Sequence, residues 1–136
     1  WTHRDPATVL GSMCSLSEAT MSVHLRRPDP HRIGRTWLGM LATGVNRAEE
    51  ARRNLPEGTL IDVPYRHLTE APGERLPELF ERLGAPWGEA ERRSLERLLS
   101  RPGGGSGHVY ELSRYGVTET EIERAFGDYG RFVAGL

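Results

Sequence analysis

Apolar residues recur along this chain at steps of three and four, and this period predicts a mostly helical protein. Clusters of proline and glycine interrupt the period and mark loops between the helices. The pattern predicts helices over residues 6–22, 31–54, 73–83 and 88–99, and a last helix that begins after Thr118.

The first helix has a clear start signal. Asp5 is a good N-cap and Pro6 is a good first helical residue. Two stripes are expected along it, an apolar one of Val9, Met13 and Leu16 and a polar one of Thr8, Ser12 and Ser15.

The remaining helices are expected to pack through one apolar face each. Trp37 is interpreted as a core residue, and the end of the second helix as solvated. Thr118 and Glu121 form a capping box for the last helix, to which no chemistry is assigned. The expected inward residues are Ile33, Trp37, Met40, Leu41, Val45, Ala48 and Ala51, then Leu76, Leu79, Phe80 and Leu83, then Leu95, Leu98 and Leu99, and finally Ile122, Phe126, Tyr129 and Val133. The expected solvated end comprises Glu49, Glu50, Arg52 and Arg53.

Two short stretches read as strands. Residues 1–4 resemble the end of a buried strand, and residues 59–64 form a β-branched run that is too short for a helix. Strands that alternate with helices are typical of an α/β fold with a parallel sheet.

Composition limits the possible functions. The 136 residues suit one soluble domain, 1–136, and the net charge of −1 does not indicate nucleic-acid binding. The chain has no lysine, which excludes lysine nucleophiles and indicates a GC-rich bacterial genome. Cys14 is the single cysteine, and we expect a reducing, cytoplasmic location without a membrane span. The histidines and Cys14 lack metal-ligand spacing, so no metal site is predicted.

The start of the first helix is the best candidate site. Arg4 stands just before the helix and Ser12 lies in its second turn, so a guanidinium and a hydroxyl could hold one anion between them. The free N–H groups and partial positive charge of a helix N-terminus favour phosphate. His3-Arg4-Asp5 also matches the start of a kinase catalytic loop, but Leu10 stands where that loop needs Asn.

An Arg and a Ser eight residues apart at a strand–turn–helix junction resemble the 3′-phosphate clamp of sulfotransferases, and the opening residues are similar to the bacterial branch of that family. Tyr65 resembles the family's tyrosine near the adenine of the donor, with Leu68 as an anchor and Pro72 as a helix start. Leu83-Gly84, 108–110 and 114–117 are similar to later family segments. Arg101 with Gly103 partly matches an Arg-Lys-Gly phosphate motif, with Pro102 in place of Lys.

This resemblance implies a sulfotransferase that uses 3′-phosphoadenosine-5′-phosphosulfate and a hydroxyl or amine acceptor, either a small molecule or a glycan. The expected fold is the C-terminal half of a P-loop-like three-layer α/β domain, mostly helical with two short parallel strands. The resemblance places the donor-binding residues at Arg4, Ser12, Tyr65 and Arg101. It places the 5′-phosphosulfate loop and the catalytic base before Trp1, so no catalytic residue is assigned and these 136 residues alone should not transfer sulfate.

Two other functions stay open on the sequence. The first is a helical interaction module without catalysis, which would expose an apolar patch. The second is another P-loop-class transferase, such as a small-molecule kinase, which would need a Gly-Lys-Ser/Thr loop. The sequence leaves the acceptor and the oligomeric state unassigned.

Overall fold

Two parallel strands, β1 (Thr2–His3) and β2 (Val63–Pro64), hold the first and the middle parts of the chain together. Thr2 pairs with Val63 and His3 with Pro64. The computed structural model describes residues 1–101 and 110–136. Because both strands run in the same direction, the residues that follow the two strands in the chain lie at the same edge of the pair.

The second strand is shorter than the predicted 59–64 run. Only Val63 and Pro64 form strand, although the Trp1 nitrogen also donates to the Ile61 carbonyl at 2.6 Å and Val63 N donates to the Trp1 carbonyl at 2.8 Å. The paired ladder comprises two residues on each strand.

Helix α1 (Pro6–Met21) begins as predicted, with Pro6 in its first turn and the Asp5 carboxylate accepting from Thr8 N at 2.8 Å. Its predicted apolar stripe was wrong. Leu10 and Cys14 are fully buried, whereas Leu16 is 60% exposed. The half-buried Ser17 and Glu18 extend this stripe, and because they are polar the hydrophobic pattern did not reveal it.

Helix α2 (Pro30–Arg53), the 3₁₀ helix η1 (Leu112–Tyr115) and helix α6 (Glu119–Gly135) pack with α1. The prediction that Trp37 packs in the core is confirmed, and its Nε1 donates to Ser17 Oγ at 2.6 Å. Met40, predicted to face inward, is 57% exposed. The capping box of α6 is present at Thr118 and Glu121. The buried core cluster is formed by Leu10, Cys14, Ile33, Tyr115 and Val117.

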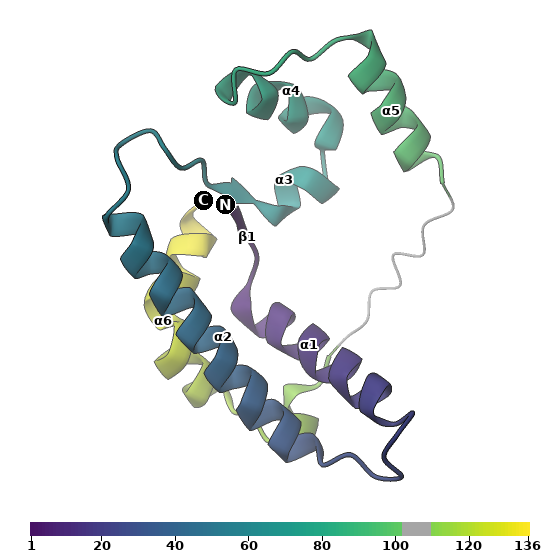
Figure 1. Cartoon of the computed structure of the whole chain (residues 1–136), viewed down its shortest axis with the longest axis vertical. Helices are drawn as coiled ribbons and strands as arrows, with labels where there is room; N and C mark the ends of the chain where they lie inside the picture. The colour runs from purple at the N-terminus through teal and green to yellow at the C-terminus, as the bar shows by residue number, and fades with distance from the viewer. Residues whose placement is uncertain (102–109) are drawn as a thin grey trace.

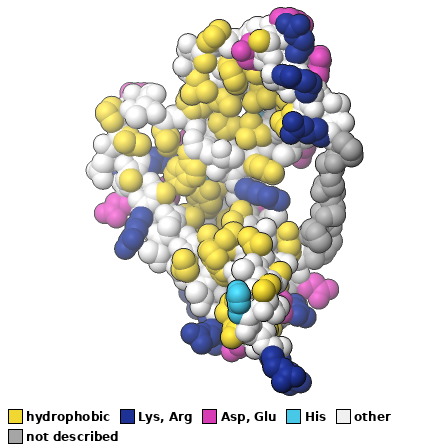
Figure 2. Space-filling model, turned by 45° about the vertical axis from the view of Figure 1, so that its right-hand side comes forward, with side chains coloured by type: hydrophobic (Ala, Val, Ile, Leu, Met, Phe, Trp, Pro, Cys, Tyr) yellow, Lys and Arg dark blue, Asp and Glu magenta, His cyan; other side chains and the backbone are white. Residues whose placement is uncertain are grey.

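Helices α3 (Tyr65–Thr69), α4 (Pro72–Arg82) and α5 (Glu89–Leu99) form a separate upper part of the molecule (Figure 1). Phe80 and Trp87 stack edge to face there, with ring centroids 4.8 Å apart. Leu83, Leu98 and Leu99 were expected to face inward, but each is about 60% exposed. Hydrophobic side chains accordingly cover much of the visible upper face in Figure 2.

The predicted fold is confirmed in its main features: a mostly helical α/β chain with two short parallel strands. Helices α1, α2 and α6 run alongside one another below the strand pair, and both chain ends lie near that pair (Figure 1). Within residues 1–101 and 110–136, no helix has the length and apolar content that crossing a membrane requires.

Candidate functional site

The candidate site lies at the edge where both strands end. Because His3 pairs with Pro64, the next residues, Arg4 and Tyr65, lie side by side. The Arg4 guanidinium carbon stands 4.6 Å from the centre of the Tyr65 ring, a cation–π contact. No carboxylate among the described residues pairs with Arg4. The Arg4 charge is therefore held in place by an aromatic face rather than neutralised by an acid.

A cavity of about 370 Å³ opens at this point. Ligands of open α/β sheets bind outside the carboxyl ends of the strands, and this cavity occupies that place. Its volume lies within the range of roughly 300–1,000 Å³ typical of small-molecule sites. The cavity is lined by His3, Arg4, Asp5, Thr8, Pro64, Tyr65, Arg66, Gly130, Val133 and Ala134.

Ser12 lies beyond this wall on the same face of α1. Thr8 lines the cavity, and Ser12 follows it by four residues, just over one helical turn. The Thr8 hydroxyl donates to the Asp5 carboxylate at 2.6 Å, so Asp5 and Thr8 are occupied in capping the helix. The convergence of Arg4 and Ser12 on one anion stays a prediction.

Arg101 is placed differently. It follows α5, is exposed and does not line the cavity. Figure 1 draws the end of α5 well apart from β1 and the start of α1. Pro102 and Gly103, which complete its predicted phosphate motif, and residues 108–109 lie outside the described residues. The structure thus brings Arg4 and Tyr65 together but not Arg101, whose role stays a prediction.

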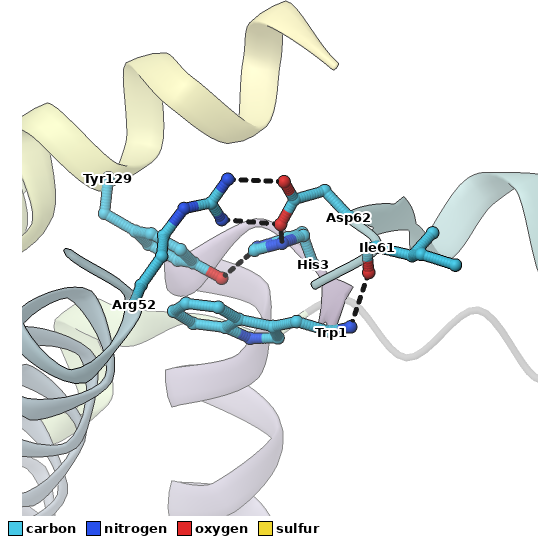
Figure 3. Close-up of polar contacts among 6 residues, drawn as sticks. All are labelled: Trp1, His3, Arg52, Ile61, Asp62 and Tyr129. Atoms are coloured by element: carbon cyan, nitrogen blue, oxygen red, sulfur yellow. Dashed lines mark hydrogen bonds and ion pairs between the residues drawn. The ribbon is translucent and has the colours of Figure 1, made fainter. Parts of the chain in front are cut away.

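The sequence analysis missed a hydrogen-bonded network around His3 (Figure 3), a residue that also lines the cavity. The His3 side chain is buried, and its Nε2 lies 2.7 Å from Asp62 Oδ1 while its Nδ1 lies 3.0 Å from the Tyr129 hydroxyl. A neutral imidazole with its proton on Nε2 satisfies both contacts, donating to the carboxylate and accepting from the phenol. Both ring nitrogens of this buried histidine are therefore used.

Arg52 completes the network from α2. Its Nη1 and Nη2 donate to the two Asp62 oxygens at 2.6 and 2.5 Å, a two-pronged contact. The contact with the Arg52 guanidinium lowers the pKa of Asp62 most, burial opposes this shift, and the His3 contact also lowers the pKa, so that the pKa of Asp62 is about 2. The prediction that Arg52 belongs to a solvated helix end was wrong, because residues just before β2 bring a carboxylate to it.

Aromatic rings enclose the same histidine. The Trp1 and Tyr129 rings lie 4.6 and 5.8 Å from the His3 ring, measured between centroids. Burial raises the pKa of the Tyr129 hydroxyl, which keeps it a donor at neutral pH. One signal in the sequence could have indicated this network: Asp62 is a charged residue inside the apolar run Leu60-Ile61-Asp62-Val63. A charge at a buried position needs a partner.

Two other candidate chemistries find no support in the described residues. Burial raises the pKa of the Cys14 thiol to about 11, so it stays protonated and unreactive at neutral pH. No group of three or more His, Cys, Asp or Glu side chains that could hold a metal occurs in the parts of the chain that the structure describes.

Comparisons with known proteins concern the family and the fold of the chain. No curated protein matches the chain. The crystal structure of sulfotransferase STF9 from Mycobacterium avium matches with a TM-score of 0.80 at 24% sequence identity. That match covers 93% of this chain and 33% of the STF9 chain, so this chain spans about a third of its length. At this identity the match shows a shared fold.

The decisive comparison concerns sequence. The family model described as Sulfotransferase family matches residues 1–89, which include both strands, Arg4, Ser12 and Tyr65. This match covers more than half of the chain and favours the sulfotransferase reading over the interaction module and the kinase. The chain belongs to the sulfotransferase family.

Proposed function

We propose that these 136 residues carry the 3′-phosphate end of the donor site in a sulfotransferase that uses 3′-phosphoadenosine-5′-phosphosulfate. The observation that supports this most directly is the Arg4 guanidinium, held over Tyr65 and free of a carboxylate partner, at the carboxyl edge of two parallel strands. A phosphate bound there would supply the missing anion.

The residues present suit such a group. Arg4 offers a rigid, permanently charged set of N–H donors that match phosphate oxygens. The start of α1 adds partial positive charge, and Ser12 is the proposed hydroxyl donor. Tyr65, 38% exposed, offers part of its ring to the adenosine. Arg101 is kept as a proposed additional phosphate contact.

The reaction proposed for the enzyme is transfer of a sulfuryl group to a hydroxyl or amine of a small-molecule or glycan acceptor. Such transfers resemble phosphoryl transfer, in which catalysis is mostly positioning and electrostatic stabilisation of charge on the leaving phosphate. Within this chain, Arg4 and Ser12 bind and orient the donor, and no residue is assigned a bond-making role. The single buried Cys14 suits the proposed cytoplasmic location.

Arg4→Ala tests the proposal. Removing a charge-assisted phosphate contact should weaken binding of adenosine 3′,5′-bisphosphate by about 1.5–3 kcal/mol, roughly 10- to 150-fold. Isothermal titration calorimetry on the chain measures this change.

Arg97→Ala is the matched control, because it makes the same change of charge on the surface of α5. Its affinity for the bisphosphate should equal that of the wild type. An Arg4→Ala variant that binds as tightly as the wild type would show that Arg4 is not the phosphate clamp.

A further inference from the structure

The buried His3 joins three segments that are far apart in the sequence. It lies on β1, it contacts Asp62 just before β2, and it contacts Tyr129 on α6. Through Asp62 it is also connected to Arg52 on α2. One imidazole thus fixes the relative positions of two strands and two helices. Sulfuryl transfer as proposed above makes no direct use of this group.

His3 itself lines the cavity, and two other members of the network, Asp62 and Tyr129, lie close in the chain to residues that line it. His3 precedes Arg4 in the chain, and Asp62 lies three residues before Tyr65. Tyr129 precedes Gly130, which lines the cavity together with Val133 and Arg4. The Tyr129–His3 hydrogen bond therefore connects the part of α6 that lines the cavity to β1.

The protonation states favour a fixed geometry. Arg52 keeps Asp62 ionised by lowering its pKa to about 2, and burial raises the pKa of Tyr129. The Asp62 carboxylate therefore remains a hydrogen-bond acceptor, and the Tyr129 hydroxyl remains a donor, across neutral pH. The aromatic packing of Trp1 against His3 and Tyr129 leaves these rings little freedom to move.

We propose that His3, Asp62, Arg52 and Tyr129 are positioning residues that hold Arg4 and Tyr65 in register to receive the 3′-phosphate. This rests on the proposed function. These residues act by positioning Arg4 rather than by binding the 3′-phosphate themselves. Displacing a positioned phosphate contact by a fraction of an ångström weakens that contact while leaving the rest of the ligand bound.

Tyr129→Phe tests the proposal because it removes one hydroxyl and keeps the ring. The measured quantity is the ratio of affinities for adenosine 3′,5′-bisphosphate and AMP, which differ by the 3′-phosphate. We expect this ratio to fall roughly three- to tenfold, the size of one hydrogen bond acting on one subsite, with AMP affinity unchanged.

Tyr115→Phe is the matched control. It also removes one tyrosine hydroxyl, which donates to Glu18 Oε2 at 3.0 Å, but it lies in the core cluster and not at the cavity. A purely structural effect would lower the melting temperature of both variants and leave the ratio intact in both. Arg52→Lys, which keeps the charge and loses the two-pronged contact, should lower the ratio as Tyr129→Phe does and serves if Tyr129→Phe does not fold.

A double-mutant cycle shows whether the network acts through Arg4. In an Arg4→Ala background, Tyr129→Phe should change the ratio no further. Three results would each overturn the positioning role. The first is an unchanged affinity ratio in Tyr129→Phe, or in Arg52→Lys where Tyr129→Phe does not fold. The others are an equal fall of the ratio in Tyr115→Phe, and a Tyr129→Phe effect that is as large in the Arg4→Ala background as in the wild type. A wild-type chain that binds both nucleotides equally would instead count against the proposed function.

Discussion

Gly34→Ala is expected to lower the free energy of unfolding by about 3 kcal/mol, the upper part of the range for overpacking a close contact. A Cβ at this position would stand 2.2 Å from the Tyr115 carbonyl oxygen and 2.9 Å from its Cβ. Helix α2 therefore packs on η1 without room for a methyl group, and the backbone would have to move. Urea unfolding followed by circular dichroism measures the loss.

Gly44→Ala on the same helix is the control. Nothing lies within 4 Å of a Cβ there, so the alanine should stabilise α2 by about 0.5–1 kcal/mol through helix propensity alone. Equal effects of the two substitutions would show that the α2–η1 approach is looser than described. The contact lies away from the cavity, so any Gly34→Ala protein that is folded should retain its nucleotide affinity.

The second large effect is a loss of stability in acid. The folded pKa of Asp62, about 2, lies below the ordinary value of 3.8. A carboxyl with a lowered folded pKa stabilises the fold above its unfolded pKa, and this contribution disappears as the pH falls through the folded pKa. Asp62 should therefore contribute roughly 2 kcal/mol at pH 5 and above, lost progressively by about pH 2. Urea midpoints across this pH range measure the loss.

Asp62→Asn isolates this contribution. Other carboxylates with lowered pKa values, such as Glu18, also titrate in acid, so the informative quantity is the difference in unfolding free energy between wild type and variant. That difference should be largest near neutral pH and shrink in acid. Asp128→Asn, at a fully exposed position, should show little change of this kind. If the difference in unfolding free energy between wild type and Asp62→Asn does not vary with pH, then Arg52 and His3 do not stabilise the charge of Asp62.

Helix α1 contributes both to the stability of the fold and to the candidate binding site, through different parts of its length. The middle of α1 contributes Leu10 and Cys14 to the core, while the start of α1 borders the cavity with Asp5 and Thr8. Gly34→Ala acts on the core cluster, where α2 packs on Tyr115, and Arg4→Ala acts at the cavity. Asp62 pairs with Arg52 and with His3, which lines the cavity, so its substitution should reduce both stability and 3′-phosphate affinity.

Local signals predicted the helix boundaries well. Asp5 with Pro6, and Thr118 with Glu121, act over one turn, and the structure has both caps. Arg4 and Tyr65 could also be found in the sequence, because each follows a strand at a fixed spacing within a family pattern. The contact between Arg4 and Tyr65 could not be predicted from the sequence, because it depends on the register of β1 against β2.

The sequence by itself predicted the family and the helices α1, α2, α4, α5 and α6, but not the short helix α3, because these features depend on neighbours within a few positions and on spacing along the chain. The residues assigned to an anion stay a prediction. Only the tertiary structure decided which face of α1 is buried and that Arg52 pairs with Asp62 beneath His3. The buried face of α1 includes Ser17 and Glu18, whose partners, Trp37 and Tyr115, come from distant segments. Burial of a polar or charged group is favourable only when such a partner is present, and that partner is fixed by packing rather than by sequence proximity.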